Sequence, residues 1–246
     1  MSNEITTIAI VLSAGQGKRM NSATAKQYLL LQGKPILYYS LKAFQDSCID
    51  HIVLVTGAAD KEYVQKEIVE KYGFTKVRCI AEGGKERYHS VYHGLCAAQS
   101  YCKGESYVFI HDGARPFVSG KIIENALACV QKEQACVVGM PVKDTIKIAD
   151  AEGYADTTPK RSLVWMVQTP QVFAMPLISR AYQELIDREE ELLSQGVLVT
   201  DDASVVELFT DKKVKLAEGS YDNIKITTPE DLDVAEVFLK KKGHIL

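Results

Sequence analysis

The chain has 246 residues, of which 46% are hydrophobic and 25% are charged, as in an ordinary soluble globular protein. Its 29 Lys and Arg and 32 Asp and Glu residues give a net charge of −3, so no strong positive field favours a nucleic acid or a membrane surface as partner. No apolar stretch approaches the length of about 18 residues that indicates a membrane span.

Apolar stretches of strand length alternate with amphipathic helical patterns through the first 141 residues. The predicted strands are 6–12, 51–56, 76–81, 106–111 and 136–141. The predicted helices are 35–44, 60–71, 86–100 and 119–134. This alternation favours the α/β class, with a mostly parallel sheet between two layers of helices. We expect a three-layer, Rossmann-like fold.

The alternation stops between Pro141 and Pro176, a stretch that holds four of the seven prolines and the only Trp. A turn at 150–153 and flanking polar runs predict exposed strands of a hairpin. We interpret about 142–173 as an arm projecting from a single domain, 1–246, because the stretch is too short for its own core. A plain solvated hairpin is the alternative.

Regular patterns return after the arm. They predict helices at 177–193, 201–209 and 229–241, and short strands at 213–216 and 223–226. The six cysteines show no Cys-x-x-Cys spacing and several have apolar neighbours, which predicts buried, reduced thiols. With no signal-peptide pattern at the N-terminus, we expect a cytoplasmic protein.

The first predicted strand ends in a loop with glycines and cations, Ser13-Ala14-Gly15-Gln16-Gly17-Lys18-Arg19-Met20, and Lys26 follows. Glycines allow backbone N–H groups to surround phosphate oxygens, and the cations add charge. A dinucleotide-binding fingerprint would need glycine at Met20, and a Walker A loop would need glycine at Leu12. The loop predicts a phosphate site of another kind, with an ordinary glycine-rich turn as the alternative.

Five further polar motifs follow the loop, most of them where a predicted strand ends. They lie at 82–91, 111–116, 141–145, 158–171 and 222–231. Because ligands bind at the carboxyl ends of parallel strands, we expect these motifs to meet at one edge of the sheet.

In type and order, the six motifs resemble those of the 2-C-methyl-D-erythritol 4-phosphate cytidylyltransferase family over nearly the whole chain. The resemblance implies that CTP and a polyol phosphate react to a CDP-linked alcohol and pyrophosphate, with Mg²⁺ or another divalent cation as cofactor. The motifs His111–Arg115 and Thr200–Ala203 favour this family over its relative, the ribitol-5-phosphate cytidylyltransferases. A non-catalytic nucleotide sensor with the same fold is the alternative from another class.

The resemblance also assigns roles to residues. It makes Arg19 and Lys26 stabilisers of the transition state, and Arg161 and Lys225 the cations that position the acceptor phosphate. Nucleotide binding is assigned to Ser13, Ala14, Gly15, Gly17, Gly84, Arg87 and Ser90. Contact with the acceptor substrate is assigned to Asp112, Arg115, Thr145 and Thr200. In the wider superfamily an aspartate binds the metal directly, so Asp112 could bind the divalent cation instead, and the ligands of the cation stay open.

The chemistry explains why these residue types are needed. Two polyanionic substrates repel each other, so the site must gather cations before a phosphate oxygen can attack the α-phosphorus of CTP. A phosphate monoester is already an anionic nucleophile, so the reaction needs no general base. His111 is therefore expected to be a structural, hydrogen-bonded residue. The arm is expected to reach a second subunit in a homodimer.

Overall fold

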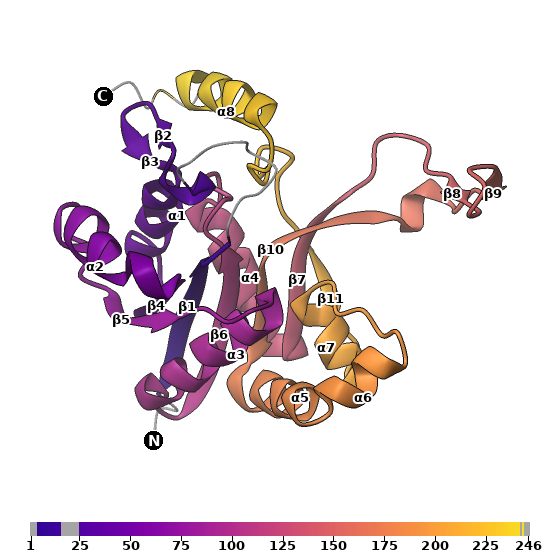
Figure 1. Ribbon diagram of the computed structural model, residues 1–246, viewed down its shortest axis with the longest axis horizontal. Coiled ribbons are helices and arrows are strands. Elements are labelled where there is room, and N and C mark those ends of the chain that lie inside the picture. The colour runs from indigo at the N-terminus through magenta and orange to yellow at the C-terminus, as the bar shows by residue number, and fades with distance from the viewer. Residues whose placement is uncertain (1–3, 16–24, 242, 244–246) are drawn as a thin grey trace.

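The computed structural model describes residues 4–15, 25–241 and 243. Its centre is a seven-stranded sheet in the order β11-β7-β10-β6-β1-β4-β5 (Figure 1). These strands are β1 (Ile5–Ser13), β4 (His51–Thr56), β5 (Val77–Glu82), β6 (Glu105–Asp112), β7 (Ala135–Pro141), β10 (Trp165–Ala174) and β11 (Lys215–Glu218). Neighbours pair in parallel except at β10, which is antiparallel to both β6 and β7. The predicted mostly parallel α/β fold is confirmed.

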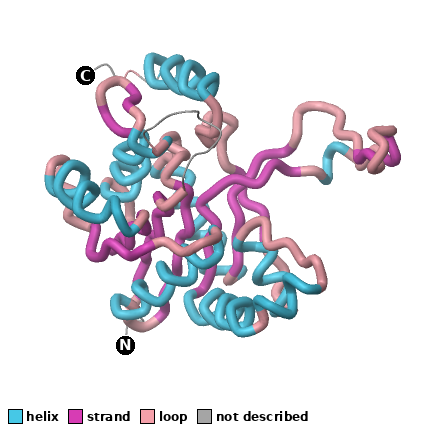
Figure 2. The backbone as a smooth tube through the Cα atoms, viewed as in Figure 1, coloured by secondary structure: helices cyan, strands magenta, loops and turns pink. Residues whose placement is uncertain are grey.

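Helices cover both faces of this sheet (Figure 2). They are α1 (Ile36–Gln45), α2 (Lys61–Tyr63) continued by the π-helical η4 (Val64–Glu70), α3 (Arg87–Ala98), α4 (Gly120–Glu133), α5 (Met175–Asp187), α6 (Glu189–Ser194), α7 (Asp202–Phe209) and α8 (Pro229–Lys241). One buried cluster joins the sheet to α1, η4 and α4, and a second joins it to α3, α5, α6 and α7.

The alternating sides of β1 show why its sequence is an unbroken apolar run. Ala9 and Val11 belong to the first cluster, whereas Ile8 and Ile10 belong to the second. All four side chains are fully buried, because both faces of a central parallel strand lie under helices. The apolar run of β1 thus corresponds to its buried part, and the strand ends at Ser13.

The arm leaves the sheet after β7 and returns through β10, with its tip far from the helices (Figure 1). Its two short antiparallel strands are β8 (Ile148–Ala149) and β9 (Ala155–Thr157), and every residue in them is exposed. The projecting part is shorter than 142–173, since β10 lies within the sheet between β7 and β6. The polar run Gln168–Gln171 with its proline hid this strand, and a bulge between Val167 and Gln171 accommodates it.

Other boundaries also differ from the prediction. The helix expected at 177–193 is divided into α5 and α6, and the strand expected at 223–226 is a loop whose Ile226 N–H donates to Ala114 O. The six cysteines are unpaired, as expected, but only Cys136 is buried. None of the helices in the described ranges has the length and apolar character that crossing a membrane requires.

Candidate active site

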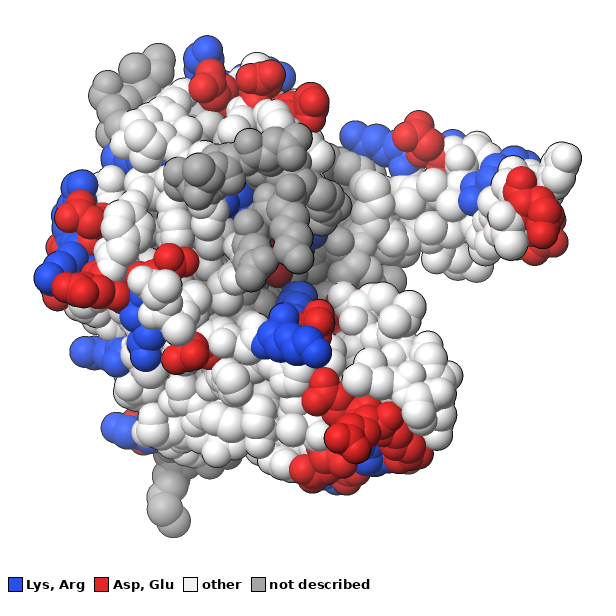
Figure 3. Space-filling model, in the orientation of Figure 1, with Lys and Arg blue, Asp and Glu red and all other residues white. Residues whose placement is uncertain are grey.

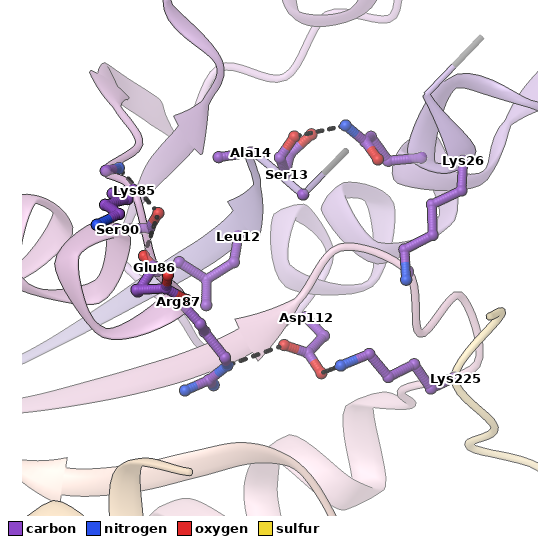
Figure 4. Close-up of a pocket in the computed structure, with 14 residues that line it drawn as sticks. Leu12, Ser13, Ala14, Lys26, Lys85, Glu86, Arg87, Ser90, Asp112 and Lys225 are labelled. Atoms are coloured by element: carbon purple, nitrogen blue, oxygen red, sulfur yellow. Dashed lines mark hydrogen bonds and ion pairs between the residues drawn. The ribbon is translucent and has the colours of Figure 1, made fainter. Parts of the chain in front are cut away.

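A cavity of about 710 Å³ opens at the carboxyl ends of β1, β5 and β6 (Figure 4). Its lining combines glycines, cations and two acidic residues. The lining residues are Leu12, Ser13, Ala14, Gly15, Lys26, Gln27, Gly84, Lys85, Glu86, Arg87, Ser90, Asp112, Ala114 and Lys225. The predicted motifs at 13–26, 82–91, 111–116 and 222–231 therefore meet at one edge of the sheet.

The loop from β5 to α3 can pack against the end of β1 and against α3 only because Gly83 and Gly84 lack side chains. A Cβ at Gly83 would lie 2.3 Å from the Cβ of Ala14, and one at Gly84 would lie 2.2 Å from the Cβ of His89. The buried Ser90 fixes the same loop, because its Oγ accepts a hydrogen bond from the Gly84 N–H at 3.0 Å. Ala14, Gly84 and Ser90 together line this side of the cavity.

The opposite wall starts with the short 3-10 helix η2 (Lys26–Tyr28). Lys26 extends from it into the cavity (Figure 4). Gln27, which the motifs did not indicate, is buried and donates from Nε2 to Ser13 O at 2.7 Å. This bond fastens η2 to the end of β1 and so fixes the start of the Lys26 side chain.

Three cations surround the carboxylate of Asp112 at the end of β6. Lys225 Nζ lies 2.7 Å from Oδ2, Arg115 Nε lies 3.8 Å from Oδ2, and Arg87 Nε lies 3.6 Å from Oδ1. Burial alone would raise the pKa of Asp112, but Arg87, Lys225 and Arg115 together hold it well below its usual range. Asp112 is therefore ionised, and it keeps these cations gathered.

Arg87 also pairs with a second carboxylate, that of Asp202, which belongs to the motif Thr200–Ala203 but was assigned no role from the sequence. Its Nη1 and Nη2 donate to the two oxygens of the fully buried Asp202 at 2.8 and 2.7 Å, and Tyr182 Oη donates to Oδ1 at 2.5 Å. Burial lowers the pKa of Arg87, but the charge and hydrogen bonds of Asp202 outweigh this effect, and the net pKa is raised above its ordinary value. The guanidinium therefore stays charged. Two fixed carboxylates thus share the charge of Arg87.

His111 has the structural role that was predicted. Its Nδ1 lies 3.0 Å from Thr169 Oγ1, and its Nε2 lies 3.1 Å from Arg115 O. Complete burial lowers its pKa to about 4, so the ring is neutral near pH 7.

Not every predicted site residue lies in this cavity. Arg115 stands behind Asp112, with Nη1 donating to Asn223 O at 2.8 Å. Thr145 and Arg161 are exposed on the arm, and Thr200 is exposed just before α7, so these three line no part of it. Gly17 and Arg19 lie outside the described residues.

The cavity offers a carboxylate that could hold a divalent cation. Among the described residues, no three His, Cys, Asp or Glu side chains come together as a metal cage. Mg²⁺ in nucleotide sites, however, usually takes one or two carboxylates together with substrate phosphates and water. Asp112 is an ionised carboxylate that lines the cavity, so it could supply that single protein ligand.

Comparison with known proteins gives one consistent result. Residues 7–241 match the family model described as 2-C-methyl-D-erythritol 4-phosphate cytidylyltransferase. The protein of that name from Lachnospira eligens is 50% identical over 233 residues, covering 94% of this chain and 98% of the relative. Its counterpart from Lachnoclostridium phytofermentans is 46% identical over 233 residues, covering 95% and 96%.

Solved structures agree with the sequence relatives. The crystal structure of 4-diphosphocytidyl-2C-methyl-D-erythritol synthase from Anaerococcus prevotii is 35% identical, with a TM-score of 0.79 and coverage of 96% of both chains. The 2-C-methyl-D-erythritol 4-phosphate cytidylyltransferase from Francisella tularensis is 28% identical, with a TM-score of 0.75 and coverage of 94% of this chain and 99% of that one.

Proposed function

The chain belongs to the 2-C-methyl-D-erythritol 4-phosphate cytidylyltransferase family, and we propose that it transfers the cytidylyl group of CTP to 2-C-methyl-D-erythritol 4-phosphate in isoprenoid precursor synthesis. The products are the CDP-linked alcohol and pyrophosphate. The observation that carries this proposal is the cavity at the ends of β1, β5 and β6, which joins a glycine-lined cleft to a cluster of cations.

The nucleotide end of the cavity lies between Ala14 and Gly84. We assign the cytosine to this cleft, with the backbone of Gly84 and the side chain of Ser90 close to its polar edge. The triphosphate then runs past Gly15 towards Lys26. Lys26 and Arg19 stabilise the charge that grows on the α-phosphate oxygens and on the departing pyrophosphate.

The acceptor phosphate belongs beside Lys225, with Arg115 adding positive charge from behind Asp112. The Lys225 side chain is 36% exposed, so its ammonium group can exchange part of its contact with Asp112 for a phosphate oxygen. Positioned there, the acceptor attacks the α-phosphorus in line with the leaving group, and no side chain has to remove a proton. When bound by Asp112 and the phosphates, Mg²⁺ would neutralise part of the negative charge.

The acceptor side of one chain is incomplete without an arm from a second chain. Thr145 and Arg161, which match the family motif, lie outside this chain's own cavity. The arm also exposes apolar side chains, with Tyr154 and Leu163 each 75% exposed. Figure 3 shows charged side chains along one edge of the arm and an uncharged stretch along the other. A homodimer in which each arm completes the partner's site would use both features.

The six unpaired cysteines agree with a reducing compartment, and the proposal includes a cytoplasmic location. Neither a nucleic acid nor a membrane takes part in the reaction.

One assay tests the function. Purified protein is mixed with CTP, Mg²⁺ and either 2-C-methyl-D-erythritol 4-phosphate or ribitol 5-phosphate, and pyrophosphate release is followed. Release with the methylerythritol phosphate at a kcat/KM at least about 100-fold higher than with the ribitol phosphate supports the proposal. Preference for ribitol phosphate would assign the alternative substrate, and binding of CTP without release would indicate a nucleotide sensor.

A further inference from the structure

The loop that carries Lys225, residues 219–226, runs from β11 past the base of the arm before it reaches α8 (Figure 1). We call it the Lys225 loop. Its first contacts are with the two strands that support the arm. The Gly219 N–H donates to Gly139 O at 2.9 Å, and Ser220 O accepts from Gln168 Nε2 at 2.7 Å. The loop therefore bridges β7 and β10 where they leave the sheet.

Tyr221 makes the contact with the arm itself. Its hydroxyl donates to Pro141 O at 2.8 Å, and Lys143 Nζ lies 3.5 Å from the centre of its ring. The carbonyl of Lys143 in turn accepts from Arg161 Nη1 at 3.2 Å. A continuous set of contacts thus joins Arg161 on the arm to the Lys225 loop.

The far end of the same loop is fastened to the site. The fully buried Asn223 donates from Nδ2 to Thr169 O at 2.9 Å, and its own carbonyl accepts from Arg115 Nη1 at 2.8 Å. Two residues later, Lys225 reaches Asp112. A segment of four residues, Tyr221 to Ile224, thus connects the arm contact to Lys225, and its Asn223 carbonyl also holds Arg115.

We propose that Tyr221 is a positioning residue that couples the arm to Lys225, so that the seating of the arm sets how each chain holds a phosphomonoester acceptor in its own cavity. The coupling rests on the proposed function for the identity of that acceptor. Tyr221 lines no part of the cavity, so its effect reaches the reaction through Lys225 and Arg115. In a dimer of the proposed kind, the same contacts would link the Arg161 of one site to the Lys225 of the other.

Two substitutions separate the contacts of Tyr221. Tyr221→Phe keeps the ring over Lys143 and loses the hydrogen bond, so we expect the KM for the acceptor to rise about 2–5-fold. Tyr221→Leu loses both contacts, and we expect a rise of about 5–20-fold. The CTP dissociation constant, kcat at saturating acceptor and the melting temperature should stay close to wild type. Tyr101→Phe is the matched control, because the Tyr101 hydroxyl also donates to a backbone carbonyl, Arg78 O, at 3.1 Å, but Tyr101 belongs to neither the arm nor the Lys225 loop.

If Tyr221 had a purely structural role, its variants would have a lower melting temperature and would bind CTP and the acceptor equally weakly. That result would overturn the proposal. An unchanged acceptor KM in both variants would overturn it as well.

A second measurement needs no turnover. Lys143→Met removes the charge over the Tyr221 ring from the arm side, and hydrogen exchange is then followed in the substrate-free protein. We expect faster exchange of the Asn223 and Ile226 amides, which donate to Ser220 O at 3.0 Å and Ala114 O at 2.8 Å. Unchanged exchange there would contradict the coupling. If the wild-type protein forms no product, the proposed function fails, whereas this exchange experiment still decides the coupling.

Discussion

The cavity edge and the arm are built in opposite ways. Around the cavity, Asp112 and Asp202 are buried, and each is held by contacts from more than one element. On the arm, β8 and β9 have only two and three residues, all of them exposed. The cavity is thus organised by this chain's own core, whereas the arm lacks a core and suits stabilisation by another surface. The following predictions test whether the two regions differ in this way.

The largest effect is expected at the catalytic end of the cavity. Lys26→Ala removes one preorganised cation, and turnover should fall about 10²–10³-fold with CTP binding affected far less. Arg19→Ala should behave alike. Steady-state kinetics and calorimetry with CTP measure both quantities. Near-normal turnover in either variant would remove that residue from its assigned role.

Two cations assigned to the acceptor phosphate provide the next test, Lys225 at the cavity edge and Arg161 on the arm. Lys225→Met and Arg161→Met should each lower kcat/KM for the acceptor about 10–100-fold, because each removes a charge-assisted contact to phosphate. The CTP dissociation constant should change less than about twofold. Lys132→Met, at a side chain that is 84% exposed on α4, is the control. An equal loss of CTP affinity would mean that these cations do not serve the acceptor.

A smaller effect is expected where the cavity wall is packed most tightly. In Gly83→Ala the new methyl group meets the Cβ of Ala14, so the two loops must separate and CTP should bind about 10-fold more weakly. Gly120→Ala is the matched control, since a Cβ there meets no atom within 4 Å. Equal CTP affinity in the two variants, measured by calorimetry, would show that the wall is looser than the structure indicates.

The buried His111 gives the stability of the cavity edge a pH dependence. Its folded pKa of about 4 lies below the ordinary value of 6.5, so the unfolded chain takes up a proton first as the pH falls. Stability should therefore be full above about pH 6.5 and should decline by about 2–3 kcal/mol between pH 6.5 and 4. The pKa of Asp112 is lowered, so its own contribution is lost only at still lower pH.

Urea unfolding at a fixed protein concentration measures this decline in the wild type and in His111→Gln. The decline should be about 2–3 kcal/mol smaller in the variant. Parallel pH profiles for the two proteins would contradict the neutral, buried state of His111.

The sequence predicted the fold well where one physical signal dominates. Residues 51–56 and 229–241 form β4 and α8 with the expected bounds, because apolar runs and helix start signals are local features. Strand β10 was hidden, since Gln168–Gln171 carries polar side chains and a proline that only the surrounding sheet and a bulge can accommodate. The arm could be recognised by its composition but not bounded by it.

The sequence predicted many of the residues of the site but few of the contacts between them. The motifs named Arg87 and Asp112, yet nothing local indicates that Arg87 pairs with Asp202, which is 115 positions further along the chain. Gln27 and Asn223 act through hydrogen bonds to backbone carbonyls of distant segments, and such partners leave no pattern in the sequence. The roles of these residues can be recognised only from the structure, where the ends of the strands lie together.

If each active site combines the cavity of one chain with the arm of another, as proposed, a variant of the cavity and a variant of the arm should complement each other. Lys26→Ala and Arg161→Ala proteins, each strongly impaired alone when the acceptor concentration is well below its KM, are mixed under conditions that exchange subunits, and exchange is verified with a mass tag. A mixed dimer then contains one site with both defects and one with neither. Random exchange makes about half of the dimers mixed, so about a quarter of wild-type activity should return. No recovery despite verified exchange would contradict the account.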